Sequence, residues 1–300
     1  MTSHCFGVAL KFIKLLLLWV SVLATTPVLA TVETIIANPV SKQDLIDVYN
    51  FELLNAALEI TRADFGDYQL VSPTVVMLSK RIATELERGE SLHIAASNVK
   101  ESWKPHVITV PFPINKGLSS LRVFYATKER AEVLAQVRSI DQLKQFKFGQ
   151  GQGWSTAKIL QDHGFKVTKS YEYSTLPRML QANRFDILMR SIREAVLEQD
   201  VLADPNSNIE LVDNIAIYTY LPMYFHVTPK RPELAERLEV GLKRLDSAGE
   251  VEKLLRKHFE RSVNLFTASE RLVFYLENTN LEPGTYQRDL PYLLKTNLQP

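Results

Sequence analysis

The stretch 147–160 holds the residues of this chain whose types and spacing could do chemistry. A short apolar and basic run leads into a loop with three glycines, Gly149, Gly151 and Gly153. Trp154 follows, and Ser155 and Thr156 then begin a segment that reads as a helix and stops at Gly164. The start of a helix presents unpaired backbone N–H groups and the positive end of the helix dipole. The pattern therefore predicts a binding place for an anionic group, an ordinary N-cap, or both.

The same glycines imitate the phosphate loop of a dinucleotide-binding enzyme, because they follow an expected strand, open a helix and are trailed by Glu172. The spacing is wrong, since the third glycine of that fingerprint would fall at Trp154. A tryptophan there would block the close packing of helix on strand that a small residue permits. We therefore expect no nucleotide cofactor.

Residues 1–30 are expected to lie outside the fold, as a signal peptide. Lys11 and Lys14 precede an apolar run at 15–24, and Val28-Leu29-Ala30 offers a small-residue cleavage site. The alternative is a transmembrane anchor, for which this run is short. The pattern predicts an exported, soluble protein.

Composition excludes several function classes. Cys5 is the only cysteine and precedes the apolar run, so the exported chain has no disulfide framework and no thiolate chemistry. Removing Lys11 and Lys14 from 35 basic residues leaves 33 against 34 acidic ones, a net charge of −1 that suggests no nucleic-acid partner. The histidines show no metal-ligand spacing, and there is no Gly-x-Ser-x-Gly elbow. We expect no metal site and no cofactor.

Beyond residue 30 the chain alternates between expected strands and helices. Strands at 34–37, 68–71 and 92–96 enclose a helix at 46–60 and a second one that begins at Pro73. This β-α-β-α-β order is typical of an α/β fold.

A second, smaller unit is expected further along the chain. It is a βαβ unit formed by 147–149, the helix that begins at Ser155, and 166–168. A β-like run at 121–126, near the expected first crossing, and a short helical piece at 140–143 precede it, and a helix at 176–182 and a strand at 185–189 follow it. A strand pair at 209–212 and 215–220 then leads back to the first unit, and Met223 to Val227 forms a last strand. Two helices follow, the second opened by a capping box at Ser247-Ala248-Gly249-Glu250.

The order of these pieces resembles the periplasmic solute-binding proteins of the amino-acid type, bacterial extracellular solute-binding family 3. The similarity covers roughly residues 33–280. The motifs that carry it are LERGESLHI (86–94), PINKGL (113–118), GQG (149–151), MLQANRFD (179–186), and the closing helices from RPEL (231–234) to KHF (257–259). No single motif would carry the resemblance, but their order along the chain does.

The resemblance implies a two-lobed type II periplasmic-binding-protein fold, with two mixed sheets flanked by helices and joined by two crossing strands. The first lobe would comprise 31–121 and 221–283, the second 122–220, and 284–300 would be a surface tail. A small solute would be held in the cleft between the lobes, which closes by a hinge motion. The implied role is ABC-type uptake by a monomeric binding protein and not an enzyme, with an ABC permease as partner.

The resemblance also implies where the ligand would bind. Polar contacts are expected at the end of a first-lobe strand, at the glycine loop with its helix start, and at the end of a second-lobe strand. The expected residues are Ser97, Asn98, Trp103, Gly153, Trp154, Ser155, Thr156, Arg190 and Ser191. Trp154 either stacks on the ligand or packs under its own loop, and Trp103 either contacts the ligand or packs against its own lobe.

The chain departs from the amino-acid binders at the second-lobe strand. Those proteins commonly place an aspartate there for the ligand's amine, but here the place falls near Ser191. Glu194 is close by and could substitute for it, but we expect it to begin a helix and face solvent. The loop at 97–103 has Lys100 but no arginine for a carboxylate. This argues against an ordinary amino-acid ligand and for an anionic or polar solute. Arg190 either captures a carboxylate or phosphate or forms a salt bridge to Glu194 or Glu198.

Two other functions use the same fold. A dehydratase-like enzyme would need a poised acid or base in the cleft, and Glu194, Glu172 and His163 have no evident partner in the sequence. A sensing protein, read by a membrane receptor, would use the same lobes and the same motion as an uptake protein.

Overall fold

The computed structural model describes residues 32–38, 44–72, 77, 79–203 and 207–298. The expected signal peptide and the helix start expected at Pro73 lie outside the described residues. Within the described ranges, no helix combines the length and the apolar character that a membrane crossing requires.

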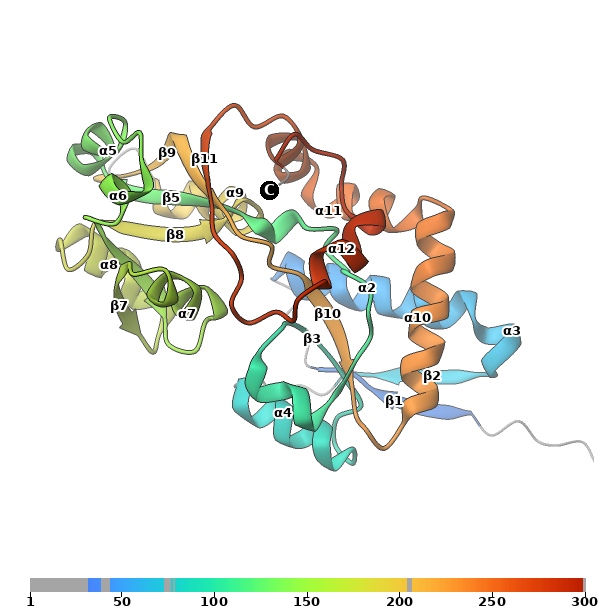
Figure 1. Cartoon of the computed structure of the whole chain (residues 1–300). Coiled ribbons are helices and arrows are strands. Elements are labelled where there is room, and N and C mark those ends of the chain that lie inside the picture. The colour runs from blue at the N-terminus through green and yellow to red at the C-terminus, as the bar shows by residue number, and fades with distance from the viewer. Residues whose placement is uncertain (1–31, 39–43, 73–76, 78, 204–206, 299–300) are drawn as a thin grey trace, which may run out of the picture.

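The first lobe is built on short strands at the lower right of Figure 1. β1 (Glu33–Ile36) pairs in parallel with β2 (Tyr68–Val71), and β10 (Met223–Val227) pairs antiparallel with both β3 (Ile94–Asn98) and β4 (Ile108–Thr109). A bridge between Ala37 and Ile94 joins the two groups. The helices of this lobe are α2 (Leu45–Ile60), α3 (Arg62–Phe65), α4 (Ser79–Arg88) and α10 (Pro232–Ser247), with a 3-10 helix, η2, at Glu101–His106.

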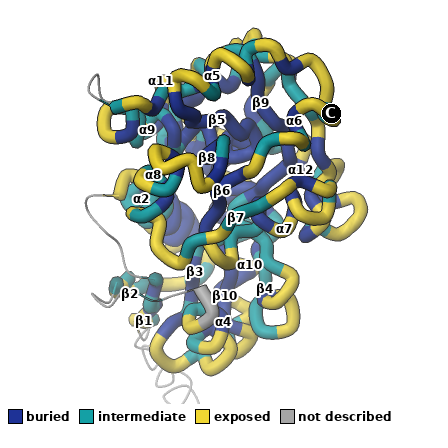
Figure 2. The backbone as a smooth tube through the Cα atoms, turned by 90° about the vertical axis from the view of Figure 1, so that its left-hand side faces the viewer, coloured by how far each residue is buried: buried dark blue, intermediate teal, exposed yellow. Residues whose placement is uncertain are grey.

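The second lobe is built on a six-stranded mixed sheet in the order β11-β9-β5-β8-β6-β7. Its strands are β5 (Leu121–Thr127), β6 (Lys147–Gly151), β7 (Lys166–Ser170), β8 (Ile187–Ser191), β9 (Ile209–Tyr218) and β11 (Leu272–Tyr275). Its helices are α5 (Lys128–Leu134), α6 (Ile140–Leu143), α7 (Ser155–Asp162), α8 (Leu176–Gln181) and α9 (Ile192–Leu202). In Figure 2, β5, β6 and β8 run dark blue through this lobe, because these central strands are buried along almost their whole length.

The two crossing segments that the resemblance implies are present, and the chain passes to the second lobe again where β11 joins its sheet. Residues 113–120, with the 3-10 helix η3 (Leu118–Ser120), lead from the first lobe into β5. Residues 219–222 lead from the end of β9 back to β10. The strand pair expected at 209–212 and 215–220 is in fact the single strand β9.

The C-terminal region differs from the expectation. β11 pairs in parallel with β9, so this part of the expected first lobe lies in the sheet of the second lobe. Residues 284–298 are no surface tail, because Asp289, Leu294 and Leu298 are buried. They include α12 (Thr285–Asp289) and the 3-10 helix η5 (Leu290–Tyr292), which lie close to the crossing segments in Figure 1.

Helix packing fixes the first lobe. α2 buries Tyr49, Leu53, Leu54, Ala57 and Leu58 on one face. Gly241 of α10 lies so close to α2 that a Cβ at this position would be 2.3 Å from the carbonyl oxygen of Ala57. α11 (Glu250–Thr267) then contacts α2, α9 and α10. The capping box expected at its start does not form, because Gly249, at φ 77°, is the N-cap and has no side chain to accept a hydrogen bond.

Candidate functional site

A cavity of about 230 Å³ lies where the two lobes meet. The first lobe contributes Ala96, Ser97, Asn98, Lys100 and Met223. The second contributes Arg122, Gly153, Trp154, Ser155, Thr156, Arg190 and Glu194, and Leu221 comes from the crossing segment. We call this cavity the cleft. Seven of the nine residues expected from the sequence line it, and Trp103 and Ser191 do not.

Trp103 belongs to the core of the first lobe and not to the cleft. It is 3 % exposed and packs in a cluster with Leu86, Leu92 and other apolar side chains. The Lys100 ammonium lies 4.9 Å from the centre of the Trp103 ring. The tryptophan therefore supports Lys100, which lines the cleft itself.

Ser191 is the N-cap of α9 and does not line the cleft. Its hydroxyl accepts a hydrogen bond from the Glu194 N–H at 3.2 Å, and its own N–H donates to the Glu194 carboxylate at 2.9 Å. This reciprocal capping box turns the Glu194 carboxylate back over the start of the helix. The expectation that Glu194 faces solvent is therefore wrong, since it lines the cleft.

Glu194 shares the second-lobe wall with two arginines. Arg190 Nη2 lies 3.5 Å from one carboxylate oxygen and Arg122 Nη2 lies 3.7 Å from the other. Burial by itself would raise the pKa of Glu194, but the charges of Arg190 and Arg122 and the Ser191 N–H outweigh it and lower the pKa to about 2. Burial lowers the pKa of Arg122 to about 10, so this guanidinium stays charged at neutral pH.

Arg190 forms the salt bridge that the sequence left open. Its Nε and Nη2 donate to the two carboxylate oxygens of Glu198 at 2.9 and 2.5 Å. The guanidinium carbon also lies 4.9 Å from the Trp154 ring centre and 4.6 Å from that of Tyr173. Arg190 lines the cleft, but Glu198 already compensates its charge.

The glycine loop brings Trp154 and the start of α7 to the cleft. A Cβ on Gly151 would lie 2.2 Å from the Trp154 ring, so the tryptophan lies directly over the loop as well as at the cleft wall. No side chain caps the start of α7 in the described structure. The first N–H groups and the positive end of this helix therefore stay directed at the cleft side of the lobe.

Ser155 and Thr156 have different partners. The Ser155 hydroxyl donates to the Val99 carbonyl at 3.2 Å, a hydrogen bond that joins the two lobes. The Thr156 hydroxyl donates to the Gln150 side chain at 2.5 Å, within the second lobe. Thr156 thus contacts the end of β6, and Ser155 links the two lobes.

Two buried polar atoms of the cleft wall have no hydrogen-bond partner among the described residues. They are Arg122 Nε, a donor in the second lobe, and Asn98 Oδ1, an acceptor in the first. A buried polar group left unpaired costs roughly 1–3 kcal/mol. Neither atom has accessible surface here, so a polar ligand or ordered water would pair with them only when the side chains that cover them move.

His226 fixes the strand end that carries Ser97 and Asn98. Its Nε2–H donates to the Ser97 carbonyl at 3.2 Å, and its Nδ1 accepts from the Thr109 hydroxyl at 3.0 Å. This pattern requires a neutral imidazole. Burial lowers the pKa of His226 from 6.5 to about 4.

We expect the protein to lose stability as the pH falls from 6.5 toward 4. In that range the unfolded chain protonates His226 and the folded protein does not, so the stabilisation that is present above pH 6.5 is lost. The free energy of unfolding should be about 2 kcal/mol lower at pH 5 than at pH 7. Denaturant titrations at both pH values check this, and His226→Gln should remove the His226 part of the difference and leave only the part from His93, whose pKa burial also lowers. An equally steep fall in that variant would contradict the assignment.

Sequence reasoning missed Arg122 because it sits inside an apolar strand that was read only as core. A single arginine in the otherwise uncharged run LRVFYAT was the available clue. Leu221 and Met223 carry no such clue. Among the described residues, no group of three or more His, Cys, Asp or Glu could hold a metal ion.

No protein-family model matches the chain, and no curated protein matches it significantly. Solved structures do match. One is from Streptococcus mutans, in work on glutathione import via GshT and the cystine ABC importer TcyBC, at 15% identity and a TM-score of 0.55, covering 76% of this chain and 95% of that chain. Another is an arginine-specific periplasmic binding protein of Salmonella typhimurium, at 13% identity and a TM-score of 0.54, covering 76% and 99%.

A third match is an ancestral amino-acid-binding protein, a precursor of cyclohexadienyl dehydratase, at 15% identity and a TM-score of 0.53, covering 75% of this chain and 95% of that chain. At such identities the likeness shows the fold alone. It agrees with the arrangement of sheets and crossing segments described above. The chain has the two-lobed α/β fold of the type II periplasmic binding proteins.

Proposed function

We propose that this protein is a periplasmic solute-binding protein that captures a small, carboxylate-bearing solute in the cleft, for uptake through an ABC permease. The observation that carries the proposal is that polar and cationic side chains of both lobes line one cavity, Asn98 and Lys100 from the first lobe and Arg122 from the second. A solute that pairs with groups on both walls would contact both lobes at once.

The charges of the cleft favour an anionic group on that solute. Lys100, Arg122 and Arg190 line the cleft together with the single carboxylate of Glu194, while Glu198 pairs with Arg190. The start of α7 adds the positive end of a helix dipole. These groups together suit a carboxylate.

A zwitterion fits the same wall. Two features argued against an amino-acid ligand, a missing aspartate in the second lobe and a missing arginine in the loop at 97–103. At the cleft, Glu194 supplies a carboxylate and Arg122 a guanidinium. Its carboxylate and Asn98 Oδ1 would accept from an ammonium group. The solved structures of similar fold concern arginine and glutathione, both of which carry carboxylates. The proposal therefore includes both carboxylate anions and zwitterions.

The lobes are joined by contacts that a hinge motion would break. Ser155 donates to the Val99 carbonyl, and Lys104 pairs with Glu282 at 3.2 Å. A solute that touches both walls would shift the equilibrium toward this closed arrangement.

Catalysis in the cleft finds less support. Glu194 is the one carboxylate that lines it, and its pKa of about 2 leaves it ionised and a weak base at neutral pH. The other candidates, Glu172 and His163, do not line the cleft. We therefore propose binding without chemistry.

Calorimetry on the purified protein tests the proposal. The panel comprises amino acids, dicarboxylates and phosphonates, each carboxylate paired with its amide. We expect saturable binding of a carboxylate solute and at least tenfold weaker binding of its amide. Binding of cationic or neutral solutes only would contradict the proposal, as would equal affinity for acid and amide.

A further inference from the structure

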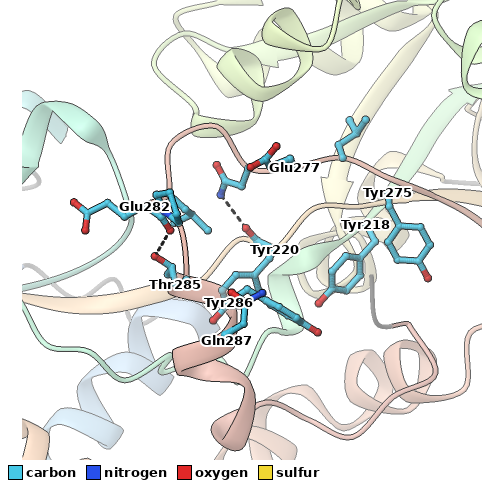
Figure 3. Close-up of a pocket in the computed structure, with 13 residues that line it drawn as sticks. Tyr218, Tyr220, Tyr275, Glu277, Glu282, Thr285, Tyr286 and Gln287 are labelled. Atoms are coloured by element: carbon cyan, nitrogen blue, oxygen red, sulfur yellow. Dashed lines mark hydrogen bonds between the residues drawn. The ribbon is translucent and has the colours of Figure 1, made fainter.

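A second cavity, of about 490 Å³, lies on the other side of the crossing segment. None of the described residues lines both this cavity and the cleft. Tyr218 and Tyr220 face the second cavity, whereas Leu221 and Met223 face the cleft. The extended chain between the lobes is therefore a wall between two separate cavities. We call the second one the hinge cavity, and Figure 3 shows its lining side chains.

Four tyrosines define the hinge cavity. Tyr218 and Tyr220 come from the end of β9 and the crossing segment, Tyr275 from β11, and Tyr286 from α12. The rings of Tyr218 and Tyr275 lie 5.7 Å apart, and those of Tyr220 and Tyr286 meet edge to face at 5.0 Å. Aromatic faces carry negative potential and attract cations.

The rings are held in place. The Tyr220 hydroxyl donates to the buried carboxylate of Asp289 at 2.6 Å, and Arg288 Nε donates to that carboxylate at 2.9 Å. Tyr218 and Tyr220 are 3 % and 6 % exposed, while Tyr275 is 44 % exposed at the mouth. The cavity thus has a fixed aromatic floor and an aromatic rim open to solvent.

The charged groups of the hinge cavity are acidic. Glu277 and Glu282 line it, and among its described lining residues there is no Lys, Arg or His. Glu282 pairs with Lys104 at 3.2 Å. Glu277 lies on the same loop and forms no ion pair within the described structure. The negative charge would repel an anionic ligand, and a neutral ligand would not compensate the charge of Glu277.

We propose that the hinge cavity is a second binding site, for a small organic cation such as a quaternary ammonium. Its volume falls within the range of small-molecule pockets, about 300–1,000 Å³. A quaternary ammonium has no N–H groups and is weakly hydrated. Proteins recognise such a group with the faces of aromatic rings, such as tyrosine, and with a nearby carboxylate. The site is independent of the solute proposed for the cleft.

Calorimetric titration of the purified protein with choline, and with its uncharged isostere 3,3-dimethylbutan-1-ol, tests this inference. The two probes have the same shape, so the difference between them reports recognition of the charge. We expect choline to bind saturably and at least fivefold more tightly than the alcohol. Hydrogen exchange should slow on choline binding in peptides that cover 218–221 and 275–287, and stay unchanged in 150–158.

Two variants locate the site within the cavity. Tyr275→Leu and Glu277→Gln should each weaken choline binding at least threefold, and Tyr171→Leu, at a tyrosine that is 92 % exposed and outside the cavity, should not change it. Absence of saturable choline binding, equal affinity for the two probes, protection confined to other segments, or unchanged binding in both cavity variants would overturn the proposal. Because the titration needs no cleft solute, its failure would leave the proposed function standing, and the reverse also holds.

Discussion

Replacing Glu198 with glutamine is expected to lower the free energy of unfolding by about 4 kcal/mol, the cost of leaving a buried charge without its partner. The partner is Arg190, which is 7 % exposed and donates to both oxygens of the Glu198 carboxylate. Glutamine keeps the shape but offers one acceptor and no charge. Glu194, at 3.5 Å, would be the nearest remaining carboxylate. Denaturant unfolding followed by circular dichroism measures the loss.

Asp200→Asn is the matched control for this experiment. Asp200 is exposed on the same helix, so its neutralisation should change stability by less than about 0.5 kcal/mol. A loss below about 1 kcal/mol in the Glu198 variant would be far short of the cost of an unpaired buried charge. That result would contradict a structural role for the ion pair between Arg190 and Glu198. Arg190 would then be available as a cation that binds the ligand.

Replacing Lys100 with methionine is expected to weaken solute binding about 100-fold, equivalent to about 2.7 kcal/mol. Burial lowers the pKa of Lys100, because its ammonium is partly removed from water at the cleft wall. A carboxylate that binds there would restore the lost stabilisation of the charge. Methionine keeps the aliphatic stem over Trp103, so the wall should stay packed. Calorimetry with the tightest solute of the panel measures the change.

Lys253→Met controls for the loss of a positive charge. This lysine lies in the first turn of α11, pairs with Glu250 at 3.1 Å and does not line the cleft. Its variant should bind solute as the parent does. Unchanged affinity in the Lys100 variant would show that the anionic group does not rest against this wall.

Much of the fold could be predicted from local patterns. β10 spans Met223–Val227 as expected, and the alternation of strands and helices in both lobes follows the spacing of apolar residues. β9 was expected as two strands, since Asp213 and Asn214 resemble a turn. β9 continues through Asp213 and Asn214 as one strand, because its residues 215–218 pair with β11. β9 also pairs with β5, with an irregularity between Arg122 and Phe124. Both pairings join segments more than fifty residues apart, which no local pattern reveals.

The sequence predicted which segments line the cleft, but it did not predict the charged groups of the cleft wall. The strand end at Ser97 and the helix start at Ser155 could be placed because strand ends and glycine loops have local signatures. Glu194 was misplaced although Ser191-x-x-Glu194 has the spacing of a capping box, which turns the carboxylate toward the strand end. Trp103 gave no local indication of its partners, since the cluster around it comes from α4, β3 and the loop between them.

A crystal structure of the protein with the tightest carboxylate solute of the panel would test the central claim most directly. The account predicts the solute between the end of β3 and the start of α7, in contact with both lobes. Its carboxylate should lie within about 3.2 Å of Lys100 Nζ or Arg122 Nε, and a donor group of the solute or a bridging water should reach Asn98 Oδ1. A solute bound outside the cleft, or held there with its carboxylate directed away from both cations, would contradict it.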